Sequence, residues 1–167
     1  KYEMRGVPLT IKQADGSLEI EEAVIVLEQD GTVYDFLFGL EMEQYSSLAE
    51  GKNIKDIRCR QIILNFIETF RTSYNKKDIQ YLENVFSDNA LIIVGKVLEQ
   101  KNDISMLHQL KSKKVELIKK SKTEYIDELK KVFNANVYIK VSFDSISIMQ
   151  HRKFDFIYSA TLIQDWQ

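Results

Sequence analysis

The stretch from Arg58 to Val97 constrains the fold of this 167-residue chain more than any other segment. Its first half places apolar residues at spacings of three and four, the pattern of a helix with one face turned toward a core. The apolar residues of this stripe are Cys59, Ile63, Phe66, Ile67, Phe70 and Tyr74, whereas Arg60, Gln61, Glu68 and Arg71 fall largely off it. The pattern predicts a helix near 54–74, with Asn53 as its N-cap and Asp56 three residues further on.

A second helix and a strand follow directly. Asp78 is a favourable N-cap, and the apolar side of the helix after it consists of Leu82, Val85 and Phe86. Residues 87–89 favour a turn, and the continuous apolar run Ala90–Val94 is typical of a strand that is buried on both faces. We therefore expect a helix over 78–86 and a strand from Ala90 to about Leu98.

This order of elements, with the sequence KKDIQYLENVFSDNALIIVG, resembles the opening of the nuclear-transport-factor-2-like superfamily. That superfamily includes the SnoaL-like and ketosteroid-isomerase-like domains, which have a cystatin-like α+β fold. The matching positions are Lys77-Asp78, Leu82, Val85-Phe86 and Asp88-Asn89-Ala90, and Lys77 stands where the superfamily usually has glycine. The resemblance implies an α+β fold in which a curved, mainly antiparallel sheet wraps around three helices as a cone-shaped roll. The chain also resembles uncharacterised domains of exported bacterial proteins, which implies a periplasmic or cell-surface location.

Residues 1–50 have the pattern of a small β-meander. The β-prone runs Val7–Lys12, Ala23–Leu27 and Val33–Leu40 are joined through Asp-Gly pairs, a strong signal for hairpins. The segment from Glu41 to Lys52 is expected to be a linker or a short helix. We interpret 1–50 as an extension or the tail of a preceding domain. We interpret 51–167 as the nuclear-transport-factor-2-like domain, without the last strand that the superfamily usually has.

The second half of the chain continues the α+β pattern. Residues 99–112 fit a helix or a loop, and 115–118 a short strand. Ser121 and Glu124 have the spacing of a capping box and predict a third helix over 122–133. Alternating apolar residues predict a hairpin of strands 137–149 and 154–166, with a bulge near Asp144-Ser145 where the alternation slips by one residue. We expect Phe66, Phe70 and Phe133 in the core where the helices meet the sheet.

The sequence predicts no catalytic residues, no metal site and no cofactor. His108 and His151 lack ligand-type neighbours, and Cys59 lies on the apolar stripe, where we expect it to be buried. Enzymes of the resembled type need a carboxylate base on the first strand, and Ala90–Val94 has none. Asp144 and Asp165 are expected to face solvent at a bulge and at a strand end. The net charge of −2 gives no drive toward nucleic acid, and no apolar run is long enough for a membrane span.

The resemblance implies an apolar concavity, and the sequence offers aromatic residues to line it. We therefore predict a non-catalytic binding or accessory domain whose pocket takes a small hydrophobic ligand or a peptide. The expected lining residues are Phe70, Tyr74, Tyr138, Tyr158 and Trp166. Two alternatives remain: a module that forms a homodimer or another complex through its sheet, and a degenerate isomerase-type or SnoaL-type enzyme. A hollow concavity favours the pocket, and a filled one favours the module.

Overall fold

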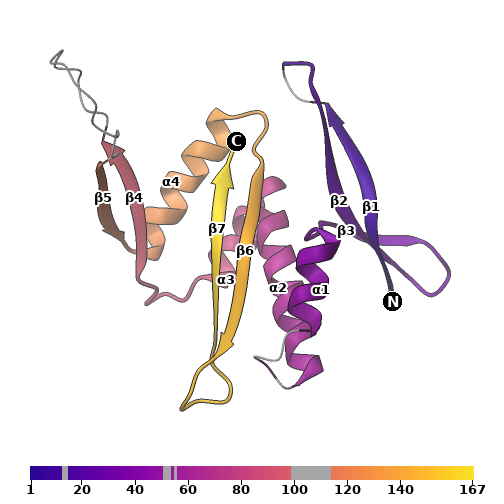
Figure 1. Ribbon diagram of the computed structural model, residues 1–167. Helices are drawn as coiled ribbons and strands as arrows, with labels where there is room; N and C mark the ends of the chain where they lie inside the picture. Colours follow the sequence, from indigo (N-terminus) through magenta and orange to yellow (C-terminus); the bar gives the residue numbers. More distant parts are fainter. Residues whose placement is uncertain (13–14, 51–53, 55, 99–113) are drawn as a thin grey trace, which may run out of the picture. The chain divides into compact units, whose positions relative to one another are not determined.

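The computed structural model describes residues 1–12, 15–50, 54, 56–98 and 114–167 (Figure 1). Over these residues the chain is α+β, with four helices and three antiparallel sheets. The helices are α1 (Met42–Glu50), α2 (Ile57–Asn75), α3 (Ile79–Val85) and α4 (Lys122–Ala135). The strands are β1 (Tyr2–Lys12), β2 (Leu18–Leu27), β3 (Val33–Phe38), β4 (Ile92–Leu98), β5 (Lys114–Lys120), β6 (Val141–Gln150) and β7 (Tyr158–Trp166). The chain forms two compact units, Lys1–Asp78 with Tyr138–Gln167, and Ile79–Val137.

The first unit combines a three-stranded sheet, two helices and a hairpin. The sheet has the order β1-β2-β3, and a bulge in β1 lies between Met4 and Val7. Gly6 has φ of 66° in this bulge, a backbone conformation that glycine adopts without strain. α2 contacts β3, α1 and β6. The β6–β7 hairpin is interrupted between Asp144 and Ser147, which confirms the bulge predicted from the slip in alternation.

The second unit consists of α3, the β4–β5 hairpin and α4. Its core is formed by Leu82 from α3 and by Ile126, Leu129 and Phe133 from α4. The rings of Phe86 and Tyr125 meet edge to face, with centroids 5.4 Å apart. α4 begins with the predicted capping box, because the Ser121 side chain accepts from the Glu124 N–H while the Glu124 side chain accepts from the Ser121 N–H.

The predicted helices and the predicted C-terminal hairpin are confirmed, with boundaries shifted by a few residues. The segment from Glu41 to Lys52 contains α1. The residue that caps α2 is Asp56, whose carboxylate accepts from the Arg58 N–H at 2.8 Å; Asn53 and the ambiguous segment 99–112 lie outside the described residues.

Three predictions about burial are wrong. Leu91, which precedes β4, and Ile93 within it are exposed, because β4 pairs with β5 in a two-stranded sheet that does not cover both faces of the strand. Phe66 is also exposed, and Phe70 and Cys59 are only partly buried. The reason is a rotation of α2 about its axis: Ile67 and Tyr74 of the predicted stripe are buried, and the inward face also includes Leu64, Glu68, Arg71 and Thr72.

Candidate functional site

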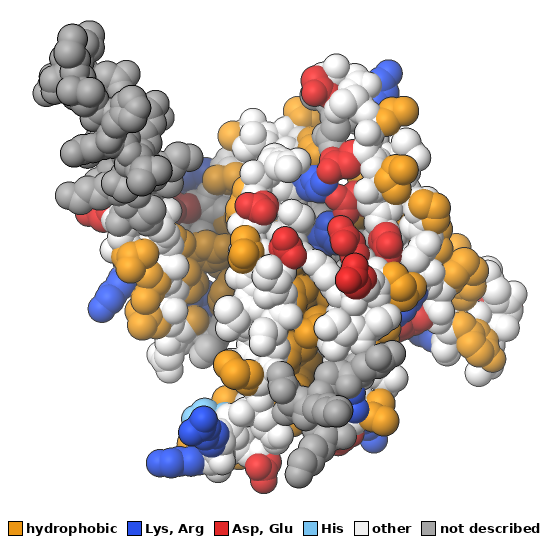
Figure 2. Space-filling view, in the orientation of Figure 1, with side chains coloured by type: hydrophobic (Ala, Val, Ile, Leu, Met, Phe, Trp, Pro, Cys, Tyr) orange, Lys and Arg blue, Asp and Glu red, His pale blue; other side chains and the backbone are white. Residues whose placement is uncertain are grey.

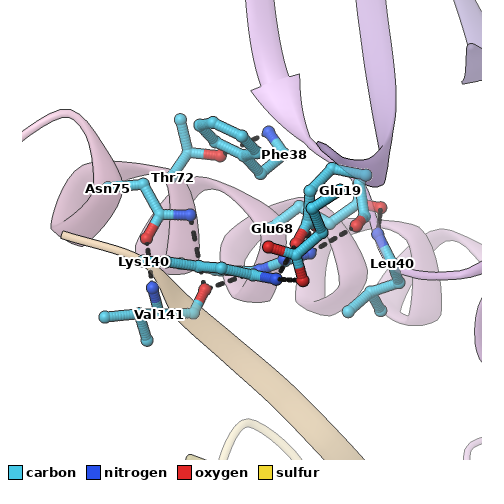
Figure 3. A network of polar contacts seen from close by, with 11 residues as sticks. Glu19, Phe38, Leu40, Glu68, Thr72, Asn75, Lys140 and Val141 are labelled. Atoms are coloured by element: carbon cyan, nitrogen blue, oxygen red, sulfur yellow. Dashed lines mark hydrogen bonds and ion pairs between the residues drawn. The ribbon is translucent and has the colours of Figure 1, made fainter. Parts of the chain in front are cut away.

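Charged side chains meet inside the first unit, where α2 passes the β1–β2–β3 sheet and the start of β6 (Figure 3). Glu68, Arg71 and Lys140 are 0%, 5% and 7% exposed, so their charges are almost entirely withdrawn from water. Arg5 from β1 and the pair Glu19 and Glu21 from β2 complete the group, which we call the charged network. Its members are Arg5, Glu19, Glu21, Glu68, Arg71 and Lys140, equal numbers of cations and anions.

Glu68 is the acidic centre of the network. Its two carboxylate oxygens accept hydrogen bonds from Arg5 Nη1 at 2.8 and 2.9 Å, and Oε1 also accepts from the backbone N–H of Leu40 at 3.0 Å. The Arg5 guanidinium lies over the ring of Tyr45, with its central carbon 4.0 Å from the ring centroid. Burial works to lower the pKa of Arg5, but the hydrogen bond and the charge of Glu68 outweigh it and raise the pKa. Glu68 therefore connects α2 with β1 and with the chain just after β3.

Arg71 uses three nitrogen atoms to contact three separate segments. Its Nε donates to the carbonyl of Val141 at 2.9 Å, and its Nη1 donates to the carbonyl of Gly39 at 2.6 Å. Its Nη2 donates to Glu21 Oε2 at 2.7 Å. The planar guanidinium thus holds β2, the residue after β3 and the start of β6 against α2.

Lys140 closes the network from the residue before β6. Its ammonium lies 2.6 Å from Glu21 Oε1 and also pairs with Glu19. Burial by itself lowers the pKa of Lys140, but hydrogen bonds to Glu19 and Glu21 and the charges of these carboxylates raise it overall. Lys140 is therefore charged at neutral pH, and it shares the Glu21 carboxylate with Arg71.

Neutral polar side chains of α2 extend the same connections. Asn75 Oδ1 accepts from the Val141 N–H at 2.6 Å, and its Nδ2 donates to the Val141 carbonyl at 3.3 Å. Thr72 Oγ1 accepts from the Phe38 N–H at 2.9 Å. Each charged member of the network is engaged by an opposite charge, so none stands ready as a general base or nucleophile. The arrangement is suited to holding strands in place.

The sequence did not predict this network. The spacing of the apolar stripe puts Glu68 and Arg71 largely off the face that it predicts to be buried. The one local signal is their spacing from Leu64 and Ile67, which puts all of them on one helical face. The partners are distant in sequence, since Glu68 and Arg5 are 63 residues apart and Arg71 and Val141 are 70 apart.

The structure brings together three of the five predicted pocket residues. The rings of Phe70 and Tyr74 meet edge to face at 5.0 Å, and those of Tyr74 and Trp166 at 5.3 Å. Tyr74 is only 1% exposed, whereas Trp166 is 44% exposed, so Tyr74 is the buried member of this ring cluster. Tyr138 lies before β6 and is exposed. Tyr158 begins β7 beside Cys59, and a hydrogen bond to the thiol, followed by burial, raises the pKa of Tyr158.

The clefts described in the structure lie elsewhere. One of about 280 Å³ in the first unit lies between α1, the start of α2 and β6, and Leu48, Arg60 and Ile148 are among its lining residues. Another of about 360 Å³ in the second unit lies between α3 and α4, and its rim carries the ion pair of Lys122 and Asp88 at 2.6 Å. Neither cleft contains any of the predicted pocket residues.

The other candidate groups face solvent. Asp144, Asp165 and His151 are exposed, and Asp144 accepts from Gln44 Nε2 at 3.1 Å. His108 lies outside the described residues. In the part of the chain that the structure describes, no three or more His, Cys, Asp or Glu side chains are grouped to hold a metal ion. No helix among these residues is long and apolar enough to cross a membrane.

One face of the β1–β2–β3 sheet carries apolar side chains in two adjacent rows. Cross-strand pairing places Tyr2, Leu27 and Val33 in one row and Met4, Ile25 and Phe36 in the next. Tyr2, Met4 and Val33 are 65%, 52% and 67% exposed. We call these six residues the apolar face. Comparisons of the chain with protein-family models, with curated proteins and with solved structures found no match.

Proposed function

We propose that the chain is a non-catalytic interaction module that pairs with a second copy of itself through the apolar face. The observation that carries this proposal is the pair of apolar rows across β1, β2 and β3, in which Tyr2, Met4 and Val33 are exposed and the other three residues are partly buried. Exposed contiguous apolar side chains mark interaction surfaces more often than isolated ones do.

The edge strand β1 is poorly suited to pairing with a further strand, which favours an interface through the apolar face. β1 is an edge strand of the sheet, and it carries both Pro8, which has no N–H to donate, and the bulge at Arg5-Gly6. Both features hinder the addition of another strand along this edge. A partner that meets the flat face of the sheet avoids them.

The charges around the apolar face favour a second copy as the occupant. Lys1 pairs with Glu28 at 3.7 Å, and Lys76 pairs with Asp35 at 3.4 Å, all with partly exposed side chains. The rim therefore carries both signs of charge. If a two-fold axis passes through the apolar face, the positively charged rim side chains of one copy can lie opposite the negatively charged ones of the other copy, so that the patch is complementary to itself.

The alternative of a pocket for a small hydrophobic ligand has less support. Phe70, Tyr74 and Trp166, which were expected to line it, pack ring against ring, and Tyr74 is buried. The fold resemblance to the nuclear-transport-factor-2-like superfamily, with one curved sheet around three helices, remains part of the proposal. It is supported by the order α2-α3-β4 and by the bulged β6–β7 hairpin.

The test is the oligomeric state of the full chain, measured by analytical ultracentrifugation over a range of concentrations. We expect a monomer–dimer equilibrium that Val33→Glu abolishes, because a buried unpaired carboxylate is costly in an interface. Ile20→Glu is the matched control, since Ile20 is equally exposed on β2 but pairs with Thr10, away from the apolar rows. A wild-type chain that remains monomeric at all concentrations, or a dimer that tolerates Val33→Glu, would overturn the proposal.

A further inference from the structure

The turn between β6 and β7 presents aromatic and basic side chains together. Residues 151–157, which we call the hairpin tip, have the sequence His-Arg-Lys-Phe-Asp-Phe-Ile. Phe156 is 79% exposed, and Phe154 and Ile157 are exposed as well. Arg152 and Lys153 are exposed beside them. Figure 2 shows blue side chains next to the pale-blue histidine at the free end of this hairpin.

The backbone of the hairpin tip is held by several hydrogen bonds. The His151 N–H donates to the Ile157 carbonyl at 2.8 Å, and the Ile157 N–H donates to the Phe154 carbonyl at 3.2 Å. Gln150 Nε2 donates to the Asp155 carbonyl at 2.8 Å, and the Lys153 N–H donates to His151 Nδ1 at 3.1 Å. The Phe154 ring stacks on His151 with centroids 5.1 Å apart and lies 5.9 Å from Phe156. The apolar side chains are thus presented by an ordered turn.

From this arrangement we infer that the hairpin tip docks on an anionic membrane surface, with Phe154, Phe156 and Ile157 entering the interfacial layer. Aromatic side chains are favoured at the boundary between headgroups and acyl chains, and adjacent Arg and Lys side chains are attracted to anionic lipid. Asp155 is the one acidic residue of the tip, so the tip carries an excess of positive charge on a chain whose formal net charge is −2. The inference is independent of the proposed dimer, because the tip and the apolar face lie on different sheets.

The size of the tip favours lipid over a protein partner. A stable protein interface takes roughly 800 Å² from each partner, so the seven residues of the tip would have to form such an interface together with neighbouring surface. A bilayer surface accepts a small apolar wedge without a complementary groove. Insertion of this kind is reversible, as expected for a single shallow contact.

The test is flotation of the full chain with vesicles of phosphatidylcholine alone and with a fraction of phosphatidylserine. We expect flotation with the anionic vesicles and a weaker signal at high salt, because the charge attraction is screened. Phe156→Ser should remove the binding, and Arg152→Glu with Lys153→Glu should lower the partition coefficient by about tenfold or more. Circular dichroism checks that each variant is folded.

Matched controls come from other parts of the chain. Ile20→Ser removes an equally exposed apolar side chain from β2, and Lys119→Glu reverses an exposed charge on β5; both should bind as the wild type does. The inference is overturned if the wild type does not float with any anionic vesicle, or if the tip variants float as well as the controls. Binding to a soluble polyglutamate peptide without binding to vesicles would indicate an acidic protein surface and would also overturn it.

Discussion

Glu68 has no exposed surface, and its carboxylate is held by Arg5 and by the backbone N–H of Leu40. Withdrawing a carboxylate from water costs several kcal/mol, and only partners with good geometry offset this. The network provides such partners for Glu68. Removal of Glu68 leaves the Leu40 N–H without its acceptor and leaves Arg5 with Glu3 as its carboxylate partner at 2.9 Å.

We expect Glu68→Ala to lower the free energy of unfolding by about 1–3 kcal/mol, because the Leu40 N–H loses its acceptor and Arg5 keeps only Glu3 as a carboxylate partner. Glu128→Ala is the control: Glu128 pairs with Lys120, but its side chain is half exposed, and the loss should stay below about 1 kcal/mol. Urea denaturation measures both. Equal losses in the two variants would contradict the burial of Glu68.

Lys140 makes the free energy of unfolding depend on pH in the alkaline range. Its pKa in the folded chain is raised above the value of about 10.4 expected in the unfolded chain. The folded state therefore binds the proton more tightly, and this contribution is fully present below the unfolded pKa. It is lost as the pH rises through the raised folded pKa.

The measurement is the free energy of unfolding against pH for the wild type and for Lys140→Met, which cannot titrate at this position. We expect the wild type to lose stability more steeply above a pH of about 10.4 than the variant does. Parallel curves for the two proteins would show that Glu19 and Glu21 do not raise the pKa of Lys140.

At the scale of elements, the start of α4 depends on the capping box of Ser121 and Glu124. We expect Ser121→Ala to cost about 1 kcal/mol, because the Glu124 N–H loses its acceptor. Thr123→Ala is the control, since Thr123 is exposed within the first turn of the helix and is not the N-cap. Chemical denaturation followed by circular dichroism compares the two, and a loss as large in Thr123→Ala would indicate a propensity effect instead of a cap.

Elements of this kind were predictable from sequence because their signals are local. The Ser121-x-x-Glu124 spacing, the alternation of β6 and β7 and the Asp-Gly turns each lie within a few residues. The rotation of α2 was not predictable in this way. Its apolar residues surround more than half of the helix, and the choice of inward face depends on Arg5, Glu21 and Val141, which contact Glu68 and Arg71. The apolar face was not predictable either, because it depends on the register in which β1, β2 and β3 pair.

At the scale of the whole molecule, the first unit is built from both ends of the chain, Lys1–Asp78 and Tyr138–Gln167. A chain that ends at Val137 lacks Lys140 and Val141. Arg71 then loses the Val141 carbonyl, Asn75 loses both of its contacts to Val141, and Glu21 loses one of its cations. We expect the β1–β2–β3 sheet of this truncated chain to be unprotected in hydrogen exchange, whereas the full chain protects it.

Adding the missing segment back to the truncated chain provides the control. Addition of a separate peptide that spans Tyr138–Gln167 should restore the protection, because it returns the missing acceptors and the β6–β7 hairpin. Strong protection of the sheet in the truncated chain alone would show that the N-terminal segment folds without its C-terminal partners.

Because the first unit consists of two segments that are separated in sequence, its parts are synthesised at different times. Lys140 and Val141 are synthesised after the whole second unit, so Glu21, Arg71 and Asn75 emerge long before their last partners exist. Since chains emerge from the N-terminus onward, α2 is synthesised before residues 79–137 and lacks its β6 partners until these residues have been made. In a nascent chain that has reached only Val137, Arg71 and Asn75 lack Val141, so the emergence of residues 138–167 is the step at which α2 can meet these partners.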